Sequence, residues 1–132
     1  MPRILFLFIL TLCGSTYAQD DSFVFRNEVR PSFDQVMSVA QLKEKRQQED
    51  LVILDVRLQE DFDKDPAVIP GAVYVNPENL PQWVSTLSAE AEVVVYCVAG
   101  KWVSQKVAFL LDQQGVNVSS LAGGFEAWKQ ED

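Results

Sequence analysis

The sequence contains no histidine and only two cysteines among its 132 residues. Without histidine, the chain cannot form a Cys–His catalytic pair, a histidine-ligated zinc site or an imidazole acid–base group. Basic residues are also scarce, since 11 Lys and Arg stand against 19 Asp and Glu. An acidic chain of this kind binds poorly to nucleic acid and to anionic lipid. We therefore expect no metal site and no nucleic-acid partner.

The sequence also has no apolar run as long as the ~20 residues that a membrane span requires. Its apolar segment 4–12 follows a single charge, Arg3, and leads into small residues that end at Ala18. This order predicts a secretory signal peptide over residues 1–18, and hence a periplasmic or secreted protein with no stable membrane insertion after cleavage. A lipoprotein cut before Cys13 is the alternative.

Removal of the signal peptide leaves one cysteine, Cys97. It also changes the formal charge to −9, because Arg3 is lost and all 19 acidic residues stay. A single thiol in an exported protein cannot form an internal disulfide. Cys97 is therefore either inert by burial or present for its chemistry.

Beyond a polar, extended lead-in at residues 19–32, the pattern alternates between strands and helices. Apolar runs predict strands at 51–56, 69–76, 92–97 and 116–121. Apolar residues at helical spacing predict helices over 38–48, 77–87, 104–115 and 123–128. This alternation predicts one α/β domain over residues 33–132, with a central, mainly parallel sheet flanked by helices.

Cys97 lies where a predicted strand ends and the next helix is about to begin. Ligands of parallel sheets bind beyond the carboxyl ends of the strands, where loop N–H groups and the helix dipole attract anions. Both features favour the thiolate, the form of cysteine that attacks. Gly100 allows a tight backbone curl, and Lys101 adds a cation. Free cysteines are often simply buried, but this order favours a nucleophile that acts on an anion with electrophilic sulfur or phosphorus.

Five ordered motifs resemble those of single-domain rhodaneses, a family of sulfurtransferases. The motifs are LDVR at 54–57, the following EDF, IPGA at 69–72, VVVYCVAG at 93–100 and LAGGFEAW at 121–128. The loop is similar to that of a subgroup that carries C-V-x-G-x-x-V-S-Q.

The resemblance implies a rhodanese-like small domain in which Cys97 carries sulfur as a persulfide. The sulfur would come from thiosulfate or a related small anion and pass to cyanide, a small thiol or a protein acceptor, with no metal or organic cofactor. The resemblance also implies that the residues after the cysteine hold the substrate: Val98, Ala99, Gly100, Lys101, Trp102, Val103 and Ser104.

Three positions depart from the family pattern. Many members have arginine directly after the cysteine and a basic or hydroxyl residue at the sixth loop position, where this chain has Val98 and Trp102. Val68 replaces the usual histidine before IPGA. With Lys101 as the only cation of the loop, the alternative function is a non-catalytic persulfide carrier or sensor, or a partner-binding module. A phosphatase is excluded, because its Cys-x5-Arg loop would need arginine at Val103.

Asp55 and Arg57 end the first predicted strand and are expected to have a structural role near the site. We expect Arg57 to pair with Asp61 or Glu60, since a buried charge needs a partner.

Trp102 and Ser104 each have two possible roles. Trp102 is expected to cover the thiol and exclude water, or to form an exposed patch for a partner. Ser104 is expected to cap the following helix, with a hydrogen bond to substrate as the alternative. The two glycines of the GGFEAW motif are expected only to provide backbone freedom.

Overall fold

A computed structural model describes Phe25, residues 29–48 and residues 50–131, so the predicted signal peptide and most of the lead-in lie outside it. The described residues form a five-stranded parallel sheet in the order β1–β5–β4–β2–β3. Its strands are β1 (Val36–Met37), β2 (Leu51–Asp55), β3 (Ala72–Tyr74), β4 (Glu92–Tyr96) and β5 (Asn117–Leu121). The predicted α/β class with a parallel central sheet is confirmed.

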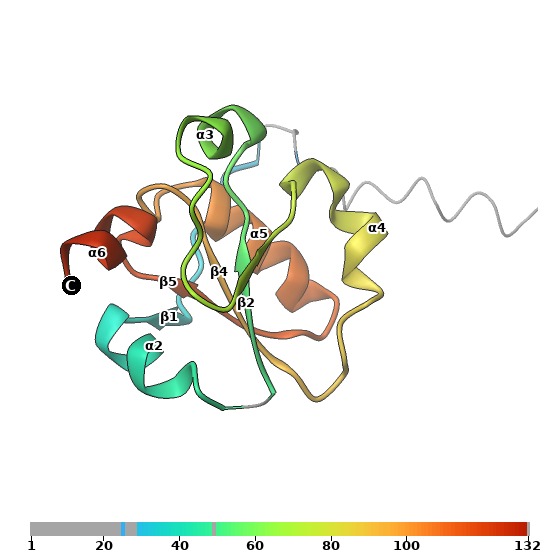
Figure 1. Cartoon of the computed structure of the whole chain (residues 1–132). Helices are drawn as coiled ribbons and strands as arrows, with labels where there is room; N and C mark the ends of the chain where they lie inside the picture. Colours follow the sequence, from blue (N-terminus) through green and yellow to red (C-terminus); the bar gives the residue numbers. More distant parts are fainter. Residues whose placement is uncertain (1–24, 26–28, 49, 132) are drawn as a thin grey trace, which may run out of the picture.

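Helices cover both faces of this sheet (Figure 1). One face is covered by α2 (Val39–Lys45) and α6 (Gly124–Gln130). The other face is covered by α4 (Leu80–Val84) and α5 (Val103–Gln113). Two further elements are α3 (Gln59–Lys64), which follows β2, and a short 3-10 helix, η4 (Pro77–Asn79). No helix among the described residues has the length and apolar character needed to cross a bilayer.

Strand β4 lies at the centre because its side chains are apolar in both directions. Val93 and Val95 pack with Val107 of α5 in one cluster, whereas Val94 and Tyr96 pack with the opposite cluster. A strand buried on both faces has a continuous apolar run rather than an alternating one. The continuous apolar run at 92–97 therefore fits both the strand and its central place in the sheet.

Most predicted elements are present, but α3 and β1 were not expected. The sequence of α3, QEDFDK, is strongly charged and has no apolar periodicity, and none of its residues is fully buried. Its Phe62 ring stacks on Tyr74 of β3, with 3.9 Å between ring centres, and so packs α3 against the sheet. Strand β1 has only two residues, so it is too short to produce a recognisable periodic pattern in the sequence.

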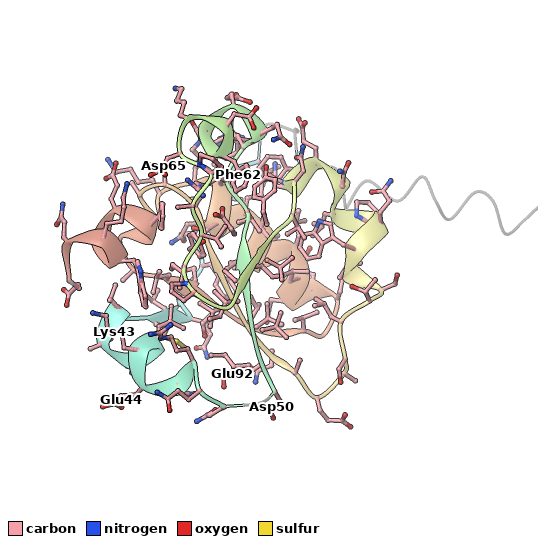
Figure 2. The ribbon with its side chains drawn as sticks, viewed as in Figure 1. Lys43, Glu44, Asp50, Phe62, Asp65 and Glu92 are labelled. Atoms are coloured by element: carbon pink, nitrogen blue, oxygen red, sulfur yellow. The ribbon has the colours of Figure 1, made fainter. Side chains whose placement is uncertain are left out.

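The carboxyl ends of β2 and β4 lie at the same end of the sheet as α3. Strands β2 and β4 are parallel and in register, with Asp55 beside Tyr96, so their carboxyl ends meet at one edge. Figure 2 shows Phe62 and Asp65, from α3 and its end, at this edge, and Asp50 and Glu92 at the opposite one. The segment that begins with Cys97 therefore emerges beside α3.

Candidate functional site

Cys97 directly follows β4, and its side chain is only 5% exposed. The Ser104 backbone N–H donates to its Sγ atom at 3.4 Å, and the Cys97 thiol donates to Ser104 Oγ at 3.3 Å. The Ser104 hydroxyl has a proton that it can donate in turn to a thiolate. Because Ser104 lies in the first turn of α5, the sulfur also lies at the positive end of the helix dipole. This position suits a negatively charged sulfur.

Ser104 does not cap α5, contrary to our expectation. The helix begins one residue earlier, at Val103, with Trp102 at the cap position and no side-chain hydrogen bond at this cap. Ser104 is therefore inside the first turn, fully buried, and its hydroxyl is directed to the sulfur. The alternative, a hydrogen bond from Ser104 to substrate, stays a prediction, and the contact with Cys97 was not foreseen.

A pocket of about 190 Å³ lies over Cys97. It is lined by Arg57, Leu58, Asp61, Cys97, Val98, Ala99, Lys101, Trp102 and Val103. It brings together most of the predicted substrate-binding residues, whereas Gly100 and Ser104 are outside its lining. Leu58 and Asp61 were missed, although they follow β2, the neighbour of β4. Among the residues that the structure describes, no group of three or more His, Cys, Asp or Glu side chains is placed so that it could bind a metal ion.

The start of α6 packs directly against the segment 97–102, which we call the cysteine loop. The Phe125 N–H donates to the Cys97 carbonyl at 2.8 Å, and the Glu126 N–H donates to the Val98 carbonyl at 3.0 Å. A Cβ atom on Gly124 would lie 2.5 Å from the same Cys97 oxygen, and the φ angle of Gly124 is +64°. Gly124 thus provides close approach as well as the predicted backbone freedom.

We expect Gly124→Ala to lower the free energy of unfolding by about 2–4 kcal/mol, from positive-φ strain and the clash with the loop. Gly115→Ala is the matched control, because Gly115 has a φ of +86° and open space around it. Gly115→Ala should lower the free energy of unfolding through the positive-φ strain alone, by about 1 kcal/mol. Urea denaturation measures both. Equal losses would show that the close approach does not stabilise the loop.

Asp55 and Arg57 form a buried ion pair behind the pocket, with 0% and 2% exposure. Arg57 Nε donates to Asp55 Oδ1 at 2.9 Å, and Nη2 donates to Oδ2 at 2.6 Å. The remaining donors reach the carbonyl oxygens of Asp65 at 2.9 Å and Ala67 at 2.8 Å. The guanidinium therefore joins the end of β2 to the segment that follows α3.

The expected pairing of Arg57 with Asp61 or Glu60 is wrong. Asp61 instead lies 3.9 Å from Lys64, within α3. Residues two apart in an extended chain project to the same side, which places Asp55 beside Arg57. Burial acts to lower the pKa of Arg57, but the hydrogen bonds and charge of Asp55 outweigh it, so this pKa is raised. Arg57 stays charged.

Two tyrosines complete this network. Tyr96 Oη donates to Asp55 Oδ2 at 3.0 Å and accepts from the Ile69 N–H at 3.0 Å. Tyr74 Oη donates to the Arg57 carbonyl at 2.7 Å. Burial, assisted by the charge of Asp55, raises the pKa of Tyr74 to about 12 and also raises that of Tyr96. Both hydroxyls therefore stay protonated and act as donors at neutral pH.

Trp102 is half-buried and is covered by residues from the N-terminal part of the chain. The Phe25 ring stacks on it with 5.4 Å between centres, and the Arg30 guanidinium carbon lies 4.0 Å from its ring centre. Because the indole also lines the Cys97 pocket, this arrangement favours the shielding role over the exposed patch.

Lys106 is a buried cation beside the same Phe25 ring. It is 1% exposed, and its Nζ atom lies 5.7 Å from the centre of the ring. Burial, and to a lesser extent the charge of Arg30, lowers the pKa of Lys106.

Comparisons with known proteins agree with this geometry. Residues 38–131 match the family model of the rhodanese-like domain. The chain is 36% identical over 96 residues to YtwF of Bacillus subtilis, which is named as a sulfurtransferase, covering 72% of this chain and 90% of YtwF. It is 40% identical over 81 residues to the thiosulfate sulfurtransferase GlpE of Coxiella burnetii, covering 61% of this chain and 73% of GlpE.

A solved structure supports the fold. The rhodanese-related protein of Thermoplasma volcanium aligns with a TM-score of 0.64 at 22% identity, and the alignment covers 74% of this chain and 93% of that one. At this identity the likeness concerns the fold alone. It agrees with the parallel five-stranded sheet described above.

Proposed function

Because the chain belongs to the rhodanese-like domain family of sulfurtransferases, we propose that it moves a sulfane sulfur from thiosulfate or a related donor to a thiol or cyanide, through a persulfide on Cys97. The observation that carries the proposal is the position of Sγ, which receives the Ser104 N–H at the start of α5 and lies under a pocket of about 190 Å³. On the signal-peptide pattern, we place this activity in the periplasm or outside the cell.

In the first step, the Cys97 thiolate attacks the outer sulfur of thiosulfate. The sulfur–sulfur bond of the donor breaks, its electron pair leaves with sulfite, and Cys97 becomes a persulfide anion. Loop N–H groups and the start of α5 stabilise the negative charge of this anion. Lys101 is an exposed cation at the rim of the pocket and attracts the dianionic donor toward an otherwise acidic chain.

In the second step, a thiolate or cyanide attacks the outer sulfur of the persulfide. A bond forms between the acceptor and that sulfur, the bond to Sγ breaks, and Cys97 returns as a thiolate. Cyanide becomes thiocyanate, and a thiol becomes a persulfide. Trp102, held under Phe25 and Arg30, limits the access of water between the two steps.

Intact-mass analysis of the protein lacking residues 1–18 tests the proposal. Incubation with thiosulfate or polysulfide should add about 32 Da, one sulfur atom, and a thiol reductant should remove it. Repeated turnover with cyanide, measured as thiocyanate, should follow. One loaded equivalent without turnover would indicate the carrier or sensor instead. No adduct from any donor, with slow alkylation of Cys97, would overturn the persulfide chemistry.

A further inference from the structure

A second pocket, of about 270 Å³, adjoins the Cys97 pocket. The two share Arg57, Asp61 and Val98 in their linings, so they are neighbours across the residue that follows the cysteine. The second pocket is further lined by Lys64, Asp65, Phe125, Glu126 and Lys129, from α3, its end and α6. We call it the α3–α6 pocket. The sulfur transfer at Cys97 assigns no role to the residues that line this pocket alone.

The α3–α6 pocket carries charges of both signs at its solvent-accessible rim. Lys129 Nζ lies 3.2 Å from Asp65 Oδ2, and Lys64 Nζ lies 3.9 Å from Asp61 Oδ1. All four side chains are substantially exposed, so a ligand can compete for the two ammonium groups. Glu126 is also exposed, and no ion pair to it is found among the described residues.

This distribution of charge selects a class of ligand. Three carboxylates, those of Asp61, Asp65 and Glu126, face two exposed ammonium groups in this pocket, because the charge of Arg57 is already balanced by Asp55. The remaining charge is negative, so the α3–α6 pocket is a poor site for a dianionic donor such as thiosulfate. A ligand with one carboxylate and one ammonium group would meet a lysine and Glu126 together. A volume of about 270 Å³ accommodates a molecule of amino-acid size.

Resting on the sulfur transfer proposed above, we propose that the α3–α6 pocket binds the sulfur acceptor as a small zwitterionic thiol, an amino-acid thiol of the cysteine type. Lys129 binds its carboxylate and Glu126 its ammonium group. Its sulfur then lies toward Val98 and meets the outer persulfide sulfur, which projects about 2 Å beyond Sγ. The acceptor sulfur bonds to that outer sulfur, and Cys97 leaves as the thiolate.

A set of four thiols tests this assignment on protein that has first been loaded with sulfur and checked by mass. Cysteine carries both charged groups, cysteamine only the ammonium group, 3-mercaptopropionate only the carboxylate, and 2-mercaptoethanol neither. The rate of persulfide loss is divided, for each variant, by its rate with 2-mercaptoethanol. This ratio removes differences in the reactivity of Cys97 between variants. Comparing the ratio of each thiol with its value in the unaltered protein then removes differences in thiol basicity.

Lys129→Met should lower the ratio about threefold to fivefold for cysteine and 3-mercaptopropionate, the loss expected for one exposed charge contact. Glu126→Gln should do the same for cysteine and cysteamine. Lys45→Met and Glu44→Gln are matched controls and should change no ratio. Lys45 also pairs with a partly exposed carboxylate, that of Glu92, and Figure 2 shows Glu92 and Glu44 far from Asp65. Unchanged ratios in the Lys129 and Glu126 variants would overturn the acceptor site alone. Failure of the loading step would overturn the proposed function, and this inference with it.

Discussion

Cys97→Ser is expected to lower sulfur transfer at least about a thousandfold, to the rate seen without protein. The Ser104 N–H, the helix dipole and the pocket would all stay in place, so the variant isolates the sulfur atom itself. A serine hydroxyl is a weak nucleophile without an adjacent base, and the chain has no histidine to provide one. The measurements are thiocyanate formation from thiosulfate and cyanide, and the intact mass after loading.

Ser104→Ala is the companion variant, because it keeps the nucleophile and removes only the hydroxyl that lies 3.3 Å from it. It should still load one sulfur but react about tenfold to a hundredfold more slowly, the effect of one hydrogen bond to a charged group. Full transfer by Cys97→Ser would mean that another group carries the sulfur. Equal, complete losses in both variants would point to a damaged loop, which a denaturation curve of each protein would reveal.

The parts of this site that the sequence predicted are those with a local signature. The buried strand before Cys97, the glycine and lysine after it, and the helix that follows are contiguous in the chain. Their order implies an anion site at the carboxyl edge of a parallel sheet before any contact is known. The parallel sheet itself followed from apolar runs that suit a strand buried on both faces.

Two of the contacts that were missed join distant segments. Trp102 is covered by Phe25, and Lys129 reaches Asp65 across 64 positions of the chain. No periodicity within a segment encodes such a pair. The error at Ser104 has a different cause: the helix begins one residue before the serine, and sequence patterns do not locate helix ends to one residue.

Asp55→Ala is expected to lower the free energy of unfolding by about 3–5 kcal/mol, because it leaves the buried Arg57 charge without its carboxylate. The Tyr96 hydroxyl would lose its acceptor as well. A domain of this size is stable by about 5–15 kcal/mol in total, so this variant should lie close to its unfolding threshold. Urea denaturation, with Asp63→Ala on the exposed face of α3 as the control, measures the difference.

A double variant, Asp55→Leu with Arg57→Met, separates the cost of an unpaired charge from the loss of packing. It removes both charges together, so it should be more stable than Asp55→Ala even though the carbonyls of Asp65 and Ala67 lose their donors. Sulfur transfer by the double variant should still be reduced, since Arg57 lines the Cys97 pocket and holds the segment after α3 beside it. A double variant less stable than Asp55→Ala would mean that the carbonyl contacts of the guanidinium, rather than its neutralisation by Asp55, stabilise this end of the sheet.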